Sequence, residues 1–531
     1  MVVHEKTKRK LSYGQIATFA KAPPALPKID PQKDLKSADK YRLLGKDVAR
    51  VDTPAKANGT AKYGIDAMVP GMVYATFVRA PVRGSGPTSF NGDEMKKAKG
   101  IADVVTLDDG VAIVGGTFEA VAKARKNLKV VWKAGQPGDG FDSDKELETY
   151  LAHVRDLGRK GEVWRTKGDA AAAIAGAATT ISRAFLSDPV YHAQLEPMNS
   201  TASVKGDTAE IWVGTQAPTR TAIDVAKAIG TTPDKVKVHQ HLLGGGYGRR
   251  AFVEPSVDAA RISKAIGKPV KLILLREDDF ASGNYRPMTA QKIDVGLDKD
   301  GKIVGWRHRV AGEPVADYLY GVGRLKASNN KDLIFINGAE IPHYAVDNQV
   351  SEHVFEPERT RVGAWRGIGA GYTKFAVESV IDEIAHERKV DPFAFRLALI
   401  ANPRAKKVVE KVAEMAEWSR KRNGTALGIA LAEYNASLAA GVAEISVDRQ
   451  SGRIRVHNYW AAADAGLPLQ PGNIAAQVEG AIVFGLSAAL KERITIANGA
   501  TKQSNFHEYE VLRMEETPEI KVEVLRGSSN P

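Results

Sequence analysis

Residues 243–250 read Leu-Gly-Gly-Gly-Tyr-Gly-Arg-Arg and lie between an alternating strand, Lys235–His239, and a helix that begins near Pro255. Four glycines around one aromatic residue allow the backbone to pass close to a ligand. Exposed N–H groups at such a turn bind anionic oxygens, and Arg249 and Arg250 would add positive charge. The spacing matches neither the GxxxxGK[ST] phosphate loop nor the GxGxxG dinucleotide fingerprint. A sharp turn that merely requires positive φ angles therefore stays open as the alternative.

A second glycine-rich turn covers residues 363–371, Gly-Ala-Trp-Arg-Gly-Ile-Gly-Ala-Gly, and leads into a helix predicted to begin near Thr373. Two such turns, each with an arginine, indicate a site for a large anionic cofactor. Coincidence is the alternative, because the chain contains 49 glycines. Gln216 follows the end of the predicted strand Glu210–Val213, where it could contact a ligand through its amide or lie solvated in a loop.

Composition narrows the class of protein. The 531 residues include 75 Lys and Arg against 63 Asp and Glu, a net charge of +12, with 43% hydrophobic and 26% charged residues. This is ordinary globular usage, which excludes a disordered, collagenous or coiled-coil protein. No apolar run approaches the roughly 18 residues that span a bilayer, so we predict no transmembrane segment. The longest apolar runs, around Ile482–Leu490, are interrupted by Gly and Ser.

Cysteine is absent from the whole sequence. This excludes disulfides, a thiolate nucleophile, a cysteine zinc site and a cysteine-held iron–sulfur cluster. Any redox chemistry must therefore use a cofactor bound without thiolates, or the clusters of a partner. The absence of cysteine fits either cytoplasm or periplasm.

The positive charge is concentrated at the N-terminus, where residues 1–50 contain 12 Lys and Arg against 5 Asp and Glu. The cluster of Lys6, Lys8, Arg9 and Lys10 would suit a nucleic-acid or anionic-lipid patch, or a solvated basic segment. No nucleic-acid-binding signature follows it, so we expect no specific nucleic-acid partner. The first residues also lack the apolar region of a signal peptide.

His192 and Glu196 are four residues apart and would share one face of a helix, where they could bind a metal. Pro197 disfavours helical geometry at Glu196, and no second histidine stands nearby to complete a ligand set. We therefore predict no protein-held metal at this position.

The local patterns predict an α+β protein. Residues 22–37 read as an extended connector that is rich in proline and lysine. Strands are predicted at residues 72–78, 101–107, 111–114, 130–132, 210–213, 235–240, 443–447, 454–460 and 520–524. Helices are predicted at residues 118–128, 147–157, 170–178, 222–229, 256–266, 375–388, 393–400 and 472–490.

Taken in order along the chain, the motifs resemble those of the molybdopterin-binding large subunits of the xanthine dehydrogenase/aldehyde oxidase family. The resemblance is strongest to the isoquinoline 1-oxidoreductase beta-subunit group. It covers nearly the whole chain and is carried by residues 41–46, 50–52, 61–66, 70–72, 196–199, 214–216, 244–250, 365–369, 477–481 and 505–509.

The resemblance implies a basic N-terminal segment and linker over residues 1–49 and an α/β hammerhead domain over residues 50–165. Mixed α/β molybdopterin-binding domains follow, the first over residues 175–400 and a partial second over residues 401–531. The implied cofactor is molybdopterin with molybdenum, in its cytosine dinucleotide form. The implied reaction hydroxylates an aldehyde or an N-heteroaromatic carbon with oxygen from water. Electrons would leave through a small iron–sulfur subunit, with a cytochrome c as a further candidate partner.

The resemblance also assigns roles to particular residues. Gln216 matches the glutamine beside the apical oxo ligand of molybdenum. Gly245, Gly246, Tyr247 and Gly248 match a Gly-Gly-Phe-Gly loop at the metal centre, with tyrosine in place of phenylalanine. The pair Arg366 and Gly367 matches the Arg-Gly pair of the second cofactor loop, and residues 477–480 are expected to serve packing.

Three family motifs do not occur in these 531 residues. The family's catalytic glutamate lies in a GxGEP motif after the strand that resembles residues 520–525, and EMGQG and TGGS motifs precede the region matched here. We therefore expect a large-subunit polypeptide that lacks both ends and is catalytic only when complemented. The rival hypothesis is a non-catalytic binding or scaffold module derived from the same fold.

Overall fold

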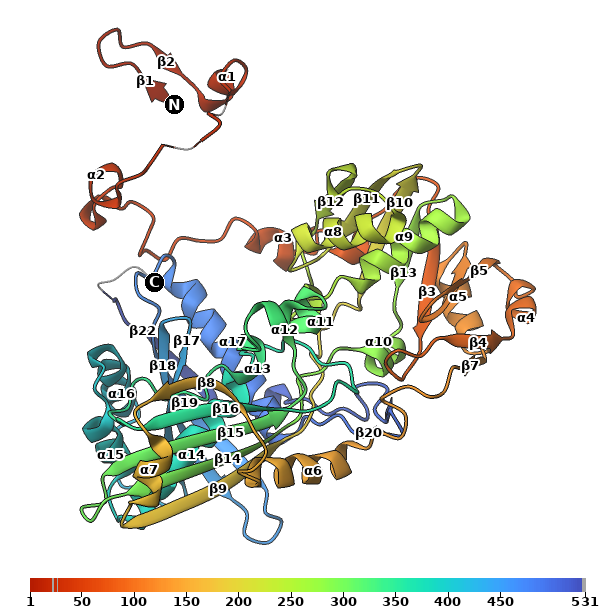
Figure 1. Cartoon of the computed structure of the whole chain (residues 1–531). Helices are drawn as coiled ribbons and strands as arrows, with labels where there is room; N and C mark the ends of the chain where they lie inside the picture. The colour runs from red at the N-terminus through yellow and green to blue at the C-terminus, as the bar shows by residue number, and fades with distance from the viewer. Residues whose placement is uncertain (22, 26, 528–531) are drawn as a thin grey trace.

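The computed structural model describes residues 1–21, 23–25 and 27–527. Within them, three larger β-sheets of seven, five and four strands pack with helices, which confirms the predicted α+β class with mixed sheets (Figure 1). Residues 22 and 26 of the predicted connector and residues 528–531 lie outside the described residues.

The N-terminal segment extends away from the rest of the chain (Figure 1). It contains short elements: β1 (Val2–Val3), β2 (Lys10–Leu11), α1 (Tyr13–Ala17), α2 (Pro31–Asp34) and η1 (Ala38–Lys40). The prediction of an extended connector over residues 22–37 is wrong at α2. Proline stands at the first position of this helix, where its fixed φ angle favours helical geometry and its missing N–H costs nothing. The backbone N–H of Asp30 also donates to the Asp34 carboxylate at 2.8 Å.

The seven-stranded sheet joins two segments that are distant in the sequence. Its strands are, in spatial order, β12 (Val236–Gln240), β11 (Thr208–Val213), β10 (Asn199–Lys205), β13 (Val270–Ile273), β3 (Val73–Arg79), β6 (Gly110–Gly115) and β5 (Ile101–Leu107). The parallel pairing of β13 with β3 makes the join. The boundary predicted between the hammerhead and the first molybdopterin-binding domain stays a prediction, and hydrogen-bonded strands cross it.

Helices and short elements accompany this sheet. They are α3 (Thr53–Ala57), η2 (Gly64–Asp66), β4 (Pro87–Phe90), α4 (Gly92–Lys96), α5 (Phe118–Arg125), β7 (Val130–Trp132), α8 (Pro218–Ile229), η3 (Pro233–Lys235), η4 (Arg249–Ala251), α9 (Glu254–Ile266) and α10 (Arg276–Ser282). Val225 and Ile229 of α8 and Ile262 of α9 are buried in one cluster with Ile211 and Leu272 of the sheet. Their helical spacing is the apolar face that the sequence pattern predicts.

The five-stranded sheet consists of β8 (Glu162–Lys167), β16 (Gln349–Phe355), β15 (Ile303–Gly312), β14 (Thr289–Leu297) and β9 (Thr179–Ser187). The four-stranded sheet consists of β17 (Ala426–Tyr434), β18 (Ser437–Val447), β19 (Ile454–Asp464) and β22 (Glu519–Val524). One hydrophobic core serves both sheets, since Ile293 and Trp306 of the first and Leu431 and Val442 of the second lie in the same buried cluster.

The elements around these two sheets are α6 (Ser143–Arg155), α7 (Ala170–Ala175), α11 (Ala316–Tyr320), α12 (Arg324–Ala327), α13 (Leu333–Ile336), α14 (Ala370–Glu387), α15 (Pro392–Leu399), α16 (Pro403–Met415), α17 (Pro471–Leu490), β20 (Ile496–Ala497), β21 (Ala500–Thr501) and η5 (Met514–Glu516). Helix α14 runs through the shared core with Val377 and Ile381 fully buried.

Helix α17 is long and apolar enough to span a membrane by length and composition, with a mean hydropathy of 1.4 over 18 residues, of which 11% are buried. It is the one such helix in the described part of the chain. Length and composition do not separate a membrane span from a helix covered by other protein. The expectation of no transmembrane segment therefore stays a prediction.

Candidate cofactor-binding site

The first glycine-rich loop leaves β12 and enters the short helix η4 with an unusual backbone. Gly245, Tyr247 and Gly248 have φ angles of +93°, +54° and +111°. A side chain at Gly248 would place its Cβ 1.6 Å from the carbonyl oxygen of Ala364, which belongs to the second glycine-rich loop. The two loops predicted to form a site are therefore in direct contact, and glycine is required where they meet.

Gln216 lies over this loop. Its backbone N–H donates to the carbonyl of Arg250 at 2.9 Å, and its side-chain Oε1 accepts from the N–H of Gly248 at 3.2 Å. A Cβ at Gly246 would come within 2.5 Å of the same Oε1. The structure thus brings together Gln216 and the glycines that the sequence singled out, and the Gln216 residue is exposed.

The second loop presents Arg366 and Gly367 just before α14. Gly367 is exposed with a φ angle of +93°, and Arg366 is half-buried. The Arg366 guanidinium donates to the backbone carbonyl of Gln477 at 2.8 Å and to its side-chain Oε1 at 3.3 Å. Partial burial lowers the pKa of Arg366, yet an arginine stays charged in proteins. Among the described residues no carboxylate pairs with it, so its charge is available to an anion.

Phe484 of α17 connects the two loops, and the sequence did not single it out. Its ring lies 4.7 Å from the ring of Tyr247 and 4.5 Å from that of Trp365, stacked on the latter. The Arg366 guanidinium lies 5.9 Å from the Phe484 ring centroid. Helical periodicity could have found this residue, because Gln477 and Phe484 are two turns apart on one face of the predicted helix.

Arg249 and Arg250 do not supply the positive charge expected of them. Both are fully buried. Arg249 forms ion pairs with Asp279 at 3.0 Å and Glu254 at 2.5 Å, and Arg250 pairs with Glu196 at 2.9 Å. Burial without partners would be very costly for a guanidinium, so these carboxylates neutralise the two side chains inside the fold. Their role is to hold the loop, and Arg366 is the cation at its surface.

Glu196 and His192 likewise act within the fold. The Glu196 carboxylate accepts from the N–H of Gly244 at 2.7 Å and from the N–H of Ile65 at 2.9 Å, in addition to its ion pair with Arg250. His192 Nε2 donates to the Ala364 carbonyl at 3.0 Å, and burial lowers its pKa to about 4, so its ring is neutral at pH 7. The geometry gives both residues other partners than a metal. No group of three metal-binding side chains occurs among the described residues.

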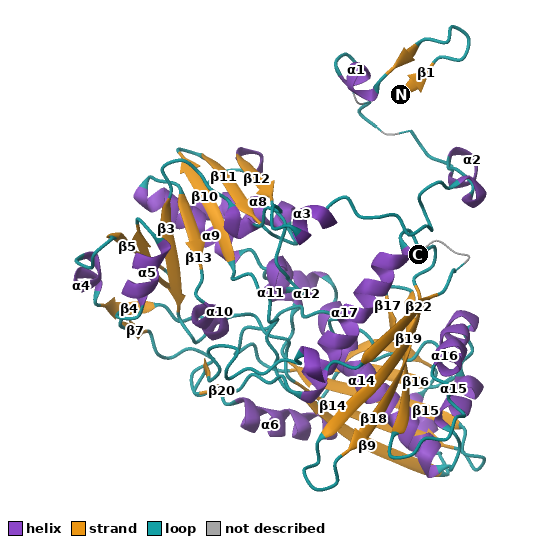
Figure 2. Cartoon of the chain, turned by 180° about the vertical axis from the view of Figure 1, so that it is seen from behind, coloured by secondary structure: helices purple, strands orange, loops and turns teal. Residues whose placement is uncertain are grey.

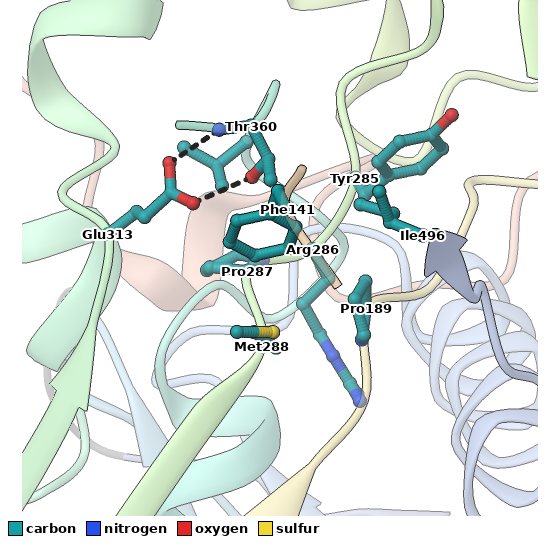
Figure 3. A pocket seen from close by; sticks show the side chains of 10 residues that line it. Phe141, Pro189, Tyr285, Arg286, Pro287, Met288, Glu313, Thr360 and Ile496 are labelled. Carbon is teal, nitrogen blue, oxygen red and sulfur yellow. Dashed lines mark hydrogen bonds between the residues drawn. The ribbon is translucent and has the colours of Figure 1, made fainter. Parts of the chain in front are cut away.

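A small cavity of about 10 Å³ lies behind the second loop, lined by residues that include Tyr285, Arg286, Glu313 and Thr360. Figure 3 shows the Glu313 carboxylate hydrogen-bonded to Thr360, whose N–H and hydroxyl donate at 3.0 and 2.9 Å. Burial raises the pKa of Glu313 to about 7, a value typical of a general base. The cavity has room for about one water molecule.

The residues present fit a pterin cofactor with anionic groups. The loop at 244–248 offers a glycine backbone that a ligand can approach closely, and Gln216 offers an amide beside that loop. Arg366 offers an uncompensated charge. These are features of a protein site for an anionic cofactor that is held without thiolate ligands.

Comparison with known proteins shows that the chain is of a molybdopterin-binding class. The molybdopterin cofactor-binding domain profile matches residues 155–399, and a second profile of the same description matches residues 372–518. The chain belongs to the xanthine dehydrogenase/aldehyde oxidase family of molybdopterin-binding oxidoreductase large subunits, as the motifs predicted.

Individual relatives support this assignment. The chain is 35% identical to isoquinoline 1-oxidoreductase subunit beta of Brevundimonas diminuta, over 99% of the chain and 72% of that protein. It is 31% identical to the membrane-bound aldehyde dehydrogenase [pyrroloquinoline-quinone] of Gluconacetobacter polyoxogenes, over 98% of the chain and 72% of that protein. Quinoline 2-oxidoreductase from Pseudomonas putida 86 shares the fold, with a TM-score of 0.75 at 14% identity, over 92% of each chain.

Proposed function

We propose that the chain holds molybdopterin with molybdenum between the loop at residues 244–248 and the loop at Arg366 and Gly367. The cofactor is in its cytosine dinucleotide form. The observation that carries this proposal is the direct contact of the two loops at Gly248 and Ala364, with Gln216 bonded to Gly248 beside them. When bound, the cofactor supplies the redox centre for hydroxylating a carbon with oxygen derived from water.

The residues of the chain have separate tasks in this proposal. Arg366 attracts an anionic group of the cofactor, because its guanidinium has no carboxylate partner among the described residues. Gly245, Gly246 and Gly248 let the cofactor approach the backbone, and Tyr247 packs on Phe484 to fix the loop. Gln216 presents its amide N–H group to the reacting centre, since its Oε1 is already bonded to the loop.

The proposed substrates are an aldehyde or an N-heteroaromatic compound, the classes named by the two relatives. The proposed electron acceptor is a small iron–sulfur subunit, with a cytochrome c as a further candidate. The absence of cysteine from these 531 residues supports a partner that holds the clusters. The rival function is a non-catalytic binding or scaffold module derived from the same fold.

The test is molybdenum content and dye-linked oxidation of aldehydes and N-heterocycles, measured on the large subunit as purified from its native host together with its partner subunit. Arg366→Ala is expected to lower bound molybdenum, with exposed Arg449→Ala as the control. Gln216→Ala is expected to lower kcat by on the order of 10² while metal content stays unchanged, with Gln450→Ala as the control. Bound metal without turnover of any substrate would support the rival function. Absence of metal in every preparation would refute the proposed cofactor.

A further inference from the structure

A pocket of about 280 Å³ opens beside the first glycine-rich loop, and its lining includes residues 251–253, which directly follow Arg250. One wall is a face of α9, where Glu254, Asp258 and Arg261 recur at helical spacing. The other walls come from the end of β3, the turn between β5 and β6, α8 and α11. Figure 2 shows α11 between the sheet that carries α8 and α9 and the other two large sheets. Because a cavity of about 150 Å³ is enough for benzene, this pocket has room for one or two aromatic rings.

The lining of this pocket carries more carboxylates than its arginines neutralise. Arg79 forms an ion pair with Asp109 and another with Asp258, so one cation serves two carboxylates. Glu254 shares Arg249 with a second buried carboxylate. The two other arginines of the lining each pair with a carboxylate of their own. The pocket therefore has surplus negative charge, which favours a cation over an anion.

Two carboxylate oxygens of the pocket lining lack a hydrogen-bond donor. Asp109 Oδ1 is buried and has no partner among the described residues. Asp258 is 3% exposed; its Oδ2 accepts from Arg79, and its Oδ1 accepts from no residue that the structure describes. Burial raises the pKa of Asp258 to about 6, so the group is a carboxylate at pH 8. Buried acceptors are nearly always paired in proteins, so the occupant that fits these oxygens carries N–H donors.

Phe252 gives the pocket an aromatic wall. Its side chain is half-buried, and a Cβ added at Gly363 would lie 3.0 Å from its Cε2, so the ring is held against the second glycine-rich loop. Tyr318 lines the pocket as well, and the Arg83 guanidinium lies 4.0 Å from the centroid of its ring. The face of an aromatic ring attracts a cation, and a flat cation can also pack on it.

We propose that this pocket binds a flat N-heteroaromatic cation of one or two rings. Its N–H groups donate to Asp109 and Asp258, and its ring packs on Phe252. Binding needs only residues of this chain and no cofactor. Under the proposed function, on which this last step alone rests, the occupant is the substrate. The pocket then favours the N-heteroaromatic class over the aldehyde class and binds the ring in its protonated form.

Two other cations fit the pocket less well. A metal ion needs several converging ligands, and no group of three metal-binding side chains occurs in the part of the chain that the structure describes. A linear polyamine supplies charge and N–H donors, but it has no flat surface to pack on Phe252.

A matched pair of ring compounds tests the proposal. At pH 8 4-aminoquinoline is a two-ring cation with N–H donors, and 1-aminonaphthalene is its neutral counterpart of the same shape. Quinoline-4-carboxylate serves as the anion, and spermidine as the linear cation. Equilibrium dialysis measures the binding of each probe to the large subunit as purified from its native host. Asp258→Asn and Asp109→Asn each remove one negative charge from the pocket, and exposed Asp300→Asn is the matched control.

We expect 4-aminoquinoline to bind at least about tenfold more tightly than 1-aminonaphthalene or spermidine, and quinoline-4-carboxylate to show no measurable binding. Each pocket variant is expected to weaken binding of 4-aminoquinoline by about tenfold, with no change in Asp300→Asn. Equal binding of the cation and its neutral counterpart, or of spermidine, would overturn the proposal. So would unchanged affinity in both pocket variants.

The comparison of probes on the unsubstituted subunit does not depend on how the variants fold. Dialysis needs neither molybdenum nor turnover, so a failure of the proposed function leaves this readout unaffected. In active enzyme, 4-aminoquinoline is expected to compete with the substrate that is oxidised. Binding without competition would overturn the assignment of the occupant as substrate.

Discussion

Replacement of Gly248 by alanine tests the contact between the two glycine-rich loops. The new Cβ would lie 1.6 Å from the Ala364 carbonyl oxygen, whereas ordinary contact begins at 3.4 Å. The loops must therefore separate by about 2 Å, and forced repacking of this kind costs about 1–3 kcal/mol. The φ angle of +111° adds a strain of about 1–2 kcal/mol for a residue with a side chain.

Gly267→Ala isolates the strain from the clash. Gly267 ends α9 with a φ angle of +68°, and a Cβ there meets no atom within 4 Å. Gly267→Ala is expected to lower the free energy of unfolding by about 1–2 kcal/mol, because the left-handed backbone conformation is strained for a residue with a side chain. In a domain of 150–250 residues, 1 kcal/mol shifts Tm by about 2–4 °C. We therefore expect Tm to fall by roughly 10 °C for Gly248→Ala and by roughly 4 °C for Gly267→Ala.

Thermal unfolding followed by tryptophan fluorescence measures both shifts, because Trp365 adjoins Ala364 in the second loop. Bound molybdenum gives an independent readout, and we expect it to fall in Gly248→Ala and to be retained in Gly267→Ala. Equal Tm shifts with equal metal content would show that the loops are not in tight contact. That result would remove the structural basis for a shared site.

Three further predictions concern side chains that are buried or half-buried in the structure. Phe484→Ala is expected to lower the free energy of unfolding by about 2–3 kcal/mol, because it removes two contacts between aromatic rings. Urea unfolding measures this loss. A smaller loss is expected for the control Phe375→Ala, because Phe375 makes one such contact. Asp279→Asn is expected to lower the free energy of unfolding by about 3 kcal/mol in the same assay, because the buried Arg249 is left with one carboxylate partner. The control Asp300→Asn, at an exposed position, is expected to change it little. Burial lowers the pKa of His353 to about 3 in the folded chain, whereas an unfolded histidine has a pKa near 6.5. Between these two pH values only the unfolded chain protonates this ring. The free energy of unfolding is therefore expected to fall as pH drops below about 6.5. A His353→Gln chain with the same pH slope between pH 7 and 5 would contradict this last assignment.

Periodicity predicted many local elements well. The strand predicted at residues 130–132 coincides with β7, and the helix predicted at residues 472–490 lies within α17. Helix α16 and strands β14 to β16 were not predicted. Strand β14 was missed although Ile293, Val295 and Leu297 recur at every second position, so the period-2 pattern could have revealed its second half.

Part of the candidate site could be predicted from the sequence. Glycines stand out because few other residues tolerate the φ angles of a turn such as that at Gly245 and Gly248. In the structure they contact Gln216 and the second loop, while their roles toward the cofactor stay proposals. Phe484 was overlooked because an aromatic residue on an apolar helix carries no sign of which loop it will meet.

The treatment of the arginines shows where sequence reasoning stops. Three arginines lie in glycine-rich loops, and sequence alone gives them the same expected role toward an anion. In the structure, carboxylates from distant segments neutralise two of them: Asp279 and Glu254 pair with Arg249, and Glu196 pairs with Arg250. Only Arg366 is left without such a partner among the described residues. Charge available to a ligand is the difference between the charges present and those already paired, and tertiary structure decides that pairing. Electrostatic recognition of the cofactor at this surface therefore rests on Arg366, although the loop sequence with two adjacent arginines looks more basic.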